Sequence, residues 1–461
     1  MKRMLSFGIC LVMLLTALLG LASCKRKPAE AYIDGVHLSE YTVVYSADGL
    51  DYDKRAAEYI AVEVEERTGI KLAVITDATA VAAHEIVVGE TSRAISDKLD
   101  AECEGLEFSM LADGGHIALE GDYFIIAAAA YFFIDTYVPG GDSSTTLPKE
   151  VTVREPIVKE AKNYIVLIGD GMGVNQTLLF EYLENDIEYS DGEDIFYGYL
   201  LPYMGYSRTA SLSGITDSAA GGTAIACGQK TLNEYLGRDK DGNDLQSLTE
   251  LAASLGKATA VMSTESNTGA TPASFSAHAN DRDSSGVISA SQSTIVKTYG
   301  TVIDCGFDYY TERMINNSVE KHITDTLDKI SADPDGFFIM YEEAHIDKHS
   351  HNNDIDKTFQ ALVRFNQAIA RFMEYAFYNP ETLLLITADH ETGDLRPEDN
   401  GELAYHTEDH SGANVPIFIY GIGGELFDGE TVENIQIGHT LASFMGVYDF
   451  GDQSEFTYLK K

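Results

Sequence analysis

The pattern of apolar and polar positions along this chain changes near residue 160. Before that point, apolar positions follow helical or short-strand spacing. In residues 53–68, for example, apolar side chains recur at helical intervals and Gly69 follows, which predicts a helix that ends there. After that point, continuous apolar runs occur, which are typical of strands buried on both faces of a parallel sheet. These runs cover residues 164–168, 259–262, 337–341, 382–387 and 415–420.

The first region predicts a small α/β domain over residues 32–155. Its segments follow one another as strand, helix, strand, strand, helix. The strands are expected at residues 42–45, 71–76 and 85–88, and the helices at residues 53–68 and 121–137. No constellation of reactive groups stands out in its sequence, so its role stays open between a spacer, a packing partner and a glycan contact.

The second region, residues 162–461, predicts the main domain, and residues 156–162 form the boundary. Helical segments lie between several of its apolar runs, and strands that alternate with helices usually build a parallel sheet. The expected fold class is therefore α/β: a central, mostly parallel sheet that helices flank, preceded by the small α/β domain.

The first 24 residues are expected to be a signal peptide. Lys2 and Arg3 precede a mostly apolar stretch at residues 5–19, which is too short for a comfortable membrane span. The following Leu-Ala-Ser-Cys ends at Cys24 and resembles the bacterial lipobox, where cleavage leaves a lipidated cysteine. This predicts a tether at residues 25–31 and an exported protein anchored at the cell surface or on the periplasmic face of a membrane. The alternative is an ordinary secretory signal with a chance cysteine.

The charge balance argues against a nucleic acid as partner. Lys and Arg number 32 and Asp and Glu 73, so the net charge is −41, and a phosphate polymer would be repelled. Solubility explains most of this charge, and acidic metal ligands add only a few carboxylates. Three further cysteines, Cys103, Cys227 and Cys305, give neither a disulfide framework nor a zinc spacing, and we expect them to be buried.

Polar residues adjoin four of the apolar runs. Asp170, Glu342, Asp389 and His390 each come shortly after a run, and His410 precedes one. In open α/β sheets, ligands bind at the carboxyl ends of the strands, so these groups can converge although they are far apart in sequence. An Asp after a strand is by itself more often a helix cap or loop residue. Their coincidence favours a shared site.

The segment that follows Glu342 contains a pair of metal-ligand type. Asp347 and His351 are four residues apart, which puts them on one face if the segment is helical. A carboxylate and an imidazole placed in this way suit a first-row metal ion. A solvated surface pair is the alternative, but six of the 12 histidines fall between residues 345 and 410.

Ser218 precedes a run of small residues that is expected to begin a helix. The N-terminus of a helix offers free N–H groups and a positive dipole end, which suit a phosphoryl group. The alternative is that Asp217 or Ser218 merely caps the helix. No G-x-S-x-G motif surrounds Ser218, so activation of its hydroxyl by a metal fits better than activation by a histidine base.

Together these stretches resemble the alkaline phosphatase family over about residues 162–450. Six motifs occur in the order of that family: GDGMG, TDSAAGGTA, ATPASFSAHANDR, EEAHIDKHSH, TADHETG and EDHSG. The first region resembles the non-catalytic N-terminal α/β domain of bacterial hexosaminidases and α-glucuronidases, through RAAEYIAVEVEERTGIKLAV, EIVVGETSR and GHIALEGD.

The resemblance implies a site with two zinc ions and one magnesium ion. One zinc would be held by Asp347, His351 and His410. The other would be held by Asp170, Asp389 and His390, close to Ser218. The magnesium would share Asp170 and take Thr271 and Glu342, an oxygen-only set that suits a hard cation.

The resemblance also implies the reaction. Ser218 would attack the phosphorus atom of a small phosphate monoester and form a phosphoserine, which water then hydrolyses. Arg282 would grip two phosphate oxygens, and Lys348 would contact phosphate through water. The expected role is phosphate scavenging at the cell envelope, with the physiological substrate open.

Two departures from the family pattern affect these expectations. Gly269 stands two residues before Thr271, where well-studied bacterial members have an Asp and animal members a His. That position tunes the third metal, so the affinity for magnesium is open. Only about 20 residues separate His390 from His410, and the subdomain that helps many members to dimerise is missing from the sequence, so a homodimer is also open.

Two rival functions remain. A phosphodiesterase or sulfatase of the same superfamily shares the metal-ligand pattern. A sulfatase needs a C/S-x-P-x-R motif, which this sequence does not contain. A diesterase usually lacks the arginine and the third-metal ligands that this chain has. A surface-anchored binding protein that keeps the fold without turnover is the second rival. The intact nucleophile, arginine and metal ligands favour the phosphatase over both.

Overall fold

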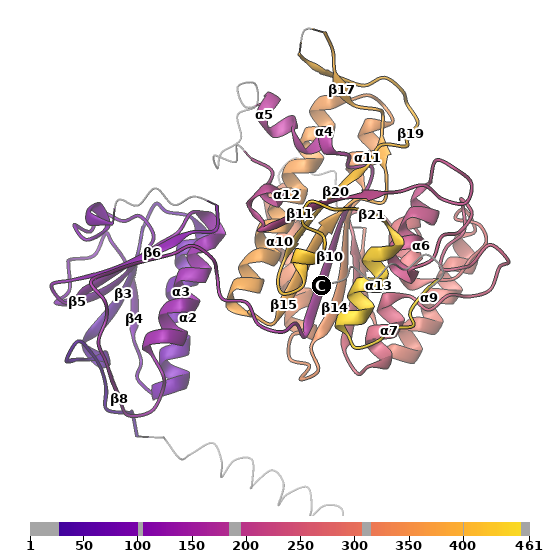
Figure 1. The fold of residues 1–461 in the computed structure, drawn as a ribbon. Coiled ribbons are helices and arrows are strands. Elements are labelled where there is room, and N and C mark those ends of the chain that lie inside the picture. Colours follow the sequence, from indigo (N-terminus) through magenta and orange to yellow (C-terminus); the bar gives the residue numbers. More distant parts are fainter. Residues whose placement is uncertain (1–26, 100–104, 184–194, 307–314, 400, 453–461) are drawn as a thin grey trace, which may run out of the picture. The chain divides into compact units, whose positions relative to one another are not determined.

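The computed structural model describes residues 27–99, 105–183, 195–306, 315–399 and 401–452 (Figure 1). The chain divides into two compact units, an N-terminal unit (Met1–Pro156) and a C-terminal unit (Ile157–Lys461). The predicted signal peptide, the lipidation site Cys24 and the predicted buried Cys103 lie outside the described residues.

The N-terminal unit is built on a six-stranded sheet with the strand order β4-β3-β5-β7-β6-β9. These strands are β3 (Tyr41–Tyr45), β4 (Ala73–Thr76), β5 (His84–Val88), β6 (Phe108–Asp113), β7 (His116–Glu120) and β9 (Glu150–Val153). All pairs are parallel except those that β6 makes with β7 and β9. A second, three-stranded sheet contains β1 (Ala31–Ile33), β2 (Val36–His37) and β8 (Ser143–Thr145).

Two helices of this unit, α2 (Asp51–Thr68) and α3 (Ile126–Tyr137), pack against each other and against the six-stranded sheet. Helix α2 ends as predicted, because Gly69 takes the left-handed conformation, with a φ of 75°, that a helix C-cap favours. The helix predicted over residues 121–137 begins later, since Tyr123–Ile125 forms a short 3₁₀ turn. Strands β6, β7 and β9 were not predicted.

The C-terminal unit contains an eight-stranded sheet with the order β13-β12-β14-β10-β15-β20-β11-β21. Its strands are β10 (Asn163–Gly169), β11 (Tyr203–Arg208), β12 (Ala258–Ser263), β13 (Val302–Cys305), β14 (Phe337–Glu343), β15 (Thr382–Thr387), β20 (Val415–Tyr420) and β21 (Thr431–Glu433). The five apolar runs found in the sequence all become strands of this sheet. All strand pairs in this sheet are parallel except the two that β20 makes with β15 and β11. The sheet is therefore mostly parallel, as predicted.

Helices cover both faces of this sheet (Figure 1). One face carries α10 (Ile315–Ile330) and α12 (Ile355–Tyr378). The other carries α6 (Ser218–Cys227), α7 (Leu248–Ser254), α8 (Ala270–Ser276), α9 (Ser285–Tyr299) and α13 (Ile435–Phe444). Shorter elements are α4 (Val174–Thr177), α5 (Leu179–Leu183), α11 (His345–Ser350), the 3₁₀ turns Tyr197–Leu200 and Gly424–Leu426, and the strand pairs β16 (Glu391–Thr392) with β19 (His410–Ser411) and β17 (Arg396–Pro397) with β18 (Leu403–Ala404). This arrangement confirms the predicted fold class.

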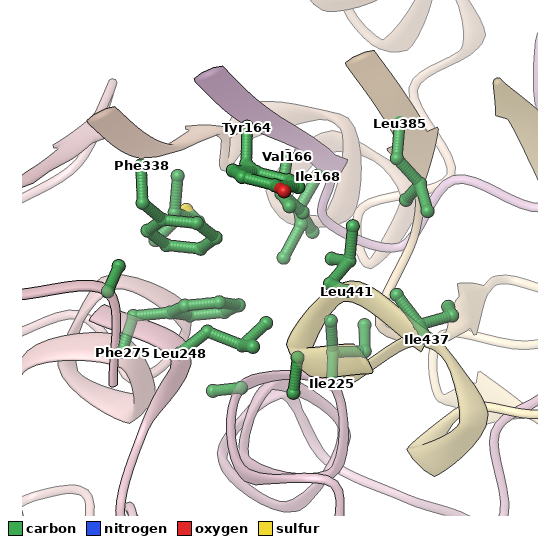
Figure 2. Packing of buried hydrophobic residues seen from close by; sticks show 14 of the residues in the cluster. Tyr164, Val166, Ile168, Ile225, Leu248, Phe275, Phe338, Leu385, Ile437 and Leu441 are labelled. Carbon is green, nitrogen blue, oxygen red and sulfur yellow. The ribbon is translucent and has the colours of Figure 1, made fainter. Parts of the chain in front are cut away.

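The core of the C-terminal unit lies between the sheet and its second layer of helices (Figure 2). Alternate residues of β10, Tyr164, Val166 and Ile168, point from the sheet toward Ile225 of α6 and Leu441 of α13. Because successive side chains of a strand point to opposite faces, the intervening residues of β10 face the other layer and are also buried. Burial on both faces explains the continuous apolar runs and holds the strand ends in fixed positions.

The expected burial of the cysteines can be compared for Cys227 and Cys305, which lie among the described residues. Cys227 is buried as expected, whereas Cys305 is only partly buried. Within the described parts of the chain, no helix has both the length and the apolar character needed to cross a bilayer.

Candidate metal centre

Three neighbouring strands deliver carboxylates to one edge of the large sheet. Strand β10 lies between β14 and β15, and Ile168 is in register with Glu342 on one side and with Thr387 on the other. Asp170 follows β10, and Asp389 follows β15, so both emerge beside Glu342. All three side chains are almost completely buried. The parallel strands thus bring together groups that are far apart in the sequence, as expected from the strand-end pattern.

His410 reaches the same edge because β20 runs in the opposite direction. In an antiparallel strand, the amino-terminal end lies where the neighbouring strands have their carboxyl ends. The segment before β20 therefore returns to the edge that holds Asp389. The short strand pair β16–β19 fixes it there, with Thr392 opposite His410. The Nδ1 atom of His410 contacts the backbone oxygen of Thr216 at 2.8 Å, which leaves Nε2 to face the site.

Asp347 and His351 lie on one face of α11, as the four-residue spacing predicted. His351 is the C-cap of this helix, and its backbone N–H donates to the Asp347 carbonyl at 2.9 Å. The Nε2 atom of His351 is 3.3 Å from Asp347 Oδ1 and 3.1 Å from His410 Nε2. His410 Nε2 is itself 3.6 Å from Asp347 Oδ1. These three side chains form the first candidate triad.

Asp170, Asp389 and His390 form the second candidate triad, in which His390 Nε2 is 3.4 Å from one carboxylate oxygen of each aspartate. The ligand atoms of this triad all lie within 4.8 Å of one another. The same holds for a set made of Asp347, His390 and His410, because the rings of His390 and His410 stack 3.6 Å apart. The two triads are therefore adjacent, and the structure brings together all six of the predicted zinc ligands.

The electrostatics of the second triad fit a cation. Burial, followed by neighbouring carboxylates, raises the pKa of Asp170 well above its usual value and that of Asp389 to about 7. Burial and the neighbouring His410 lower the pKa of His390 to about 3, so its imidazole is neutral. Asp170 Oδ1 and Asp389 Oδ2 are buried without a hydrogen-bond partner among the described residues. Buried carboxylates that face one another in this way are stabilised by a metal ion, which also needs neutral imidazole ligands.

Ser218 is the first residue of α6 and does not cap it. Asp217 is the N-cap, and its Oδ1 atom accepts a hydrogen bond of 2.9 Å from the Ala220 N–H. The Ser218 side chain is 3% exposed, and its Oγ lies 3.1 Å from His390 Nε2. The hydroxyl group therefore faces the second triad from the N-terminus of a helix.

Arg282 lies beside the serine through Asp217. Its Nη1 donates to Asp217 Oδ2 at 3.2 Å, and its side chain is 32% exposed. Asp217 thus uses one oxygen to begin α6 and the other to hold the guanidinium group. The remaining donors of Arg282 are free of hydrogen bonds within the described residues, and a planar guanidinium placed in this way suits an oxyanion.

Thr271 and Glu342, the other residues expected to share a magnesium ion with Asp170, are fully buried. Ser263 donates a short hydrogen bond to Glu342 Oε2. Glu342 Oε1 and Thr271 Oγ1 have no hydrogen-bond partner among the described residues. Burial and then the charge of Glu265 raise the pKa of Glu342 well above its usual value. An oxygen-only set with unpaired buried atoms fits a hard cation.

Lys348 pairs with a carboxylate, since its Nζ donates to Glu265 Oε2 at 2.5 Å. Its expected contact with phosphate through water stays a prediction. Glu265 was not among the predicted site residues, although it lies just after β12, where the strand-end rule could have found it. Thr392 was also missed. Its hydroxyl group contacts Asp347 and His390, and its position two residues after His390 was the available signal.

The alkaline phosphatase family model matches residues 161–317 and 300–400. Alkaline phosphatase 3 of Bacillus subtilis is 31% identical over 285 residues, which are 51% of this chain and 62% of that protein. Alkaline phosphatase 4 of the same organism is 28% identical over 301 residues, 54% of this chain and 65% of that protein. The chain therefore spans less than two thirds of the length of these relatives.

Solved structures of alkaline phosphatases also resemble this chain. The alkaline phosphatase of the Antarctic bacterium TAB5 is 25% identical and superposes with a TM-score of 0.54, over 63% of this chain and 99% of that one. A mutant of the TAB5 enzyme, with a TM-score of 0.53 and the same coverage, has bound magnesium. The cold-active alkaline phosphatase of Shewanella, 21% identical with a TM-score of 0.53 over 61% of this chain and 99% of that one, shows the shared fold alone.

Proposed function

Since the chain belongs to the alkaline phosphatase family, we propose that it is a metal-dependent phosphate monoester hydrolase that acts through a phosphoserine on Ser218. The observation that carries this proposal is the position of the Ser218 hydroxyl group. It lies at a helix N-terminus, 3.1 Å from His390, and so faces a buried triad whose carboxylates lack partners. These positions support a site in which a nucleophile, a phosphate-binding helix end and a bound cation would act together.

The residues present fit the metals that the resemblance implies. Asp347, His351 and His410 would hold one zinc ion, and Asp170, Asp389 and His390 the other. A magnesium ion would share Asp170 with Thr271 and Glu342. When bound, these ions supply positive charge that stabilises a serine alkoxide, a leaving oxygen and the negative phosphoryl group.

Ser218 would act as the nucleophile. Its hydroxyl group loses a proton to water, and the bond from Oγ to phosphorus forms. The bond from phosphorus to the leaving oxygen breaks with its electron pair on that oxygen, which takes up a proton from water. In the second half-reaction, water attacks phosphorus, and Oγ leaves and is protonated again, so that free phosphate is released. The neutral state of His390 and its place in the triad favour a role as a ligand over a role as a general base.

Arg282 would hold the equatorial oxygens of the phosphoryl group during both steps. Its link to Asp217 keeps the guanidinium group beside Ser218, because the same aspartate caps the helix that begins with the serine. The nucleophile and its phosphate clamp are thus fixed to one another before substrate arrives. Such preorganisation lowers the cost of orientation in the transition state.

Replacing Ser218 tests this proposal. With an aryl phosphate monoester at alkaline pH, Ser218→Ala is expected to lower turnover by at least about three orders of magnitude, because the nucleophile is lost. Zinc and magnesium content, measured by elemental analysis, should stay unchanged. Ser254→Ala is the matched control, because that hydroxyl group bonds only a carbonyl of its own helix and should leave turnover unchanged. Unchanged turnover in Ser218→Ala would refute the proposal.

A second assay separates the rivals. The wild-type protein is expected to hydrolyse the aryl monoester much faster than the matching diester, since Arg282 and the third-metal residues suit a phosphoryl group with three free oxygens. A faster diester reaction would favour a phosphodiesterase. A protein that binds zinc and hydrolyses neither compound would be a binding protein.

The proposal extends to the place of the reaction. We infer that the protein is exported and anchored through a lipid on Cys24, and that it scavenges phosphate at the cell envelope. The support is the sequence alone, because Cys24 lies outside the described residues. In a bacterial host, Cys24→Ala is expected to abolish incorporation of labelled fatty acid, because the thiol that carries the lipid is lost. Incorporation that survives this change would refute the anchor.

A further inference from the structure

Position 269 has no side chain because another residue fills the space. A Cβ atom added to Gly269 would lie 1.8 Å from Glu265 Oε1 and 2.2 Å from Glu265 Cδ, distances at which atoms overlap. Gly269 is the N-cap of α8, and Thr271 follows two residues later. The carboxylate of Glu265 therefore occupies the volume that a side chain at position 269 would take.

Glu265 is tied to the same residues that surround Thr271. It lies in the loop between β12 and α8, and its backbone N–H donates to Ser263 Oγ at 2.9 Å. The hydroxyl group of Ser263 in turn donates to Glu342. Because Ser263 is fully buried, this short chain of bonds holds the start of the loop against the Glu342 carboxylate.

A second contact holds the Glu265 carboxylate near the proposed magnesium residues. The side chain is 18% exposed, and its Oε2 atom accepts a hydrogen bond of 2.5 Å from Lys348. Lys348 follows Asp347 in α11, so this pair joins the loop after β12 to the helix that carries a predicted zinc ligand. Together with the bonds through Ser263 to Glu342 and the contact at position 269, it places Glu265 beside residues expected to hold the third cation.

We propose that Glu265 supplies the acidic group of the third cation site, in place of a side chain at position 269, and that it positions Lys348 beside that site. This inference rests on the proposed function because both concern the same metal centre. The cation is a hard divalent ion such as Mg²⁺, since Asp170, Glu342, Glu265 and Thr271 offer oxygen alone. Lys348 balances one of the three carboxylates, which limits their mutual repulsion.

Binding of Mg²⁺ alone, with no substrate present, gives the test. The full chain is stripped of metal, reloaded with zinc and titrated with Mg²⁺ by calorimetry. Glu265→Gln is expected to raise the dissociation constant about 10- to 100-fold. Glu381→Gln is the matched control. Glu381 also pairs with a lysine, Lys162, at 3.0 Å, but it precedes β15 and so lies at the opposite end of that strand from Asp389. This variant should bind Mg²⁺ as the wild type does. An unchanged dissociation constant in Glu265→Gln would overturn the proposal.

A relocation experiment excludes a merely structural effect. Glu265→Gly combined with Gly269→Asp moves the carboxylate to the other position and is expected to bind Mg²⁺ at least about 10-fold more tightly than Glu265→Gly alone. Gly269→Asp alone should weaken binding, because the new side chain collides with Glu265. Failure of the double variant to regain affinity would count against the proposal.

The same substitution in a Lys348→Met protein distinguishes an effect of Glu265 on the cation site from the loss of its pair with Lys348. If Glu265 served only as the partner of Lys348, then Glu265→Gln would have no effect on Mg²⁺ binding once Lys348→Met is present. We expect it still to weaken binding about 10-fold or more, and no effect would overturn the inference. A wild-type protein that binds Mg²⁺ but hydrolyses no monoester would refute the proposed function and leave this inference to be decided by Glu265→Gln.

Discussion

At the scale of single residues, the hydroxyl group of Thr392 joins the two candidate triads. It donates to Asp347 Oδ1 at 2.5 Å and lies 3.2 Å from His390 Nδ1. One threonine thus contacts a predicted ligand of each zinc ion. Groups that contact ligands in this way fix their orientation and tune metal affinity, although they do not touch the metal.

Thr392→Val is therefore expected to weaken zinc binding about 10- to 100-fold, because Asp347 and His390 lose the hydroxyl group that orients them. Competition with a chromogenic chelator measures this affinity. Thr387→Val is the matched control, since that buried hydroxyl group bonds the Pro416 carbonyl and touches no predicted ligand. Equal losses in both variants would show that any buried threonine near this edge matters and would contradict the role of Thr392.

The site residues could be predicted from the sequence where they come after the end of a strand. Asp170, Asp389 and His390 come directly after continuous apolar runs, and parallel strands bring such residues to one edge. Their roles as ligands stay predictions. The Glu265 position was less accessible, because its meaning depends on the space left by Gly269, which only the folded structure reveals. The same holds for Lys348, whose partner comes from a distant loop.

At the scale of elements, the sequence predicted which segments of the C-terminal unit become strands but not their order or direction. Apolar runs report burial, and every residue is buried both in β20 and in β15, its antiparallel neighbour. The direction of β20 decides where His410 lies, so this single feature could not be derived from hydrophobicity. In the N-terminal unit, β6 and β7 were missed. They form a hairpin that turns through Gly114 and Gly115, both with positive φ.

The packing of α6 controls the position of the serine. A Cβ atom on Gly221 would lie 2.7 Å from the Asp389 carbonyl oxygen, and one on Gly222 would lie 2.4 Å from Ser274 Oγ. These glycines let the helix lie directly against the segment that carries Asp389 and against α8. The Ser218 hydroxyl group can approach His390 because the first turn of α6 carries no bulk on that side.

Gly221→Ala is expected to lower kcat/KM about 10- to 100-fold, since the added methyl group pushes the first turn of α6 away from Asp389. Overpacking should also cost about 1–3 kcal/mol of unfolding free energy. Gly286→Ala is the matched control, because it lies within α9 with nothing near its added Cβ and should be neutral or stabilising by about 0.5–1 kcal/mol. Turnover of the phosphate monoester and chemical denaturation measure the two effects. Full activity in Gly221→Ala would contradict this packing argument.

At the scale of the whole molecule, the two units have separate sources of stability. The N-terminal unit has its own apolar cluster, which includes Val44, Val87 and Leu111, and the residues proposed to bind metal all belong to the C-terminal unit. A ligand stabilises only the unit whose folded state binds it. Adding zinc and magnesium to the metal-free chain is therefore expected to raise the thermal transition of the C-terminal unit.

In the N-terminal unit, the ionisation of Asp53 makes stability depend on pH. Burial, followed by Glu90, raises its pKa to about 7, although a bond from the backbone at Leu50 opposes this. Its carboxylate fits against Gly89, where an added Cβ would lie 2.4 Å from Asp53 Oδ1. Because the folded pKa exceeds the unfolded value, folding favours the protonated acid. The unit therefore loses stability as the pH rises from about 4 to about 7, and the penalty persists above that range.

Asp53→Asn removes this penalty without changing the shape of the side chain. At pH 8 to 9 it is expected to raise the thermal midpoint of the N-terminal unit by at least about 4 °C, and at pH 4 by much less, because the wild-type acid is then largely protonated in the folded state. Calorimetry with and without metal assigns the transitions, since metal acts on the other unit. Asp51→Asn is the matched control, because Asp51 lies exposed in the same helical turn. An equal shift from Asp53→Asn at both pH values would mean that packing, and not ionisation, limits the stability of this unit.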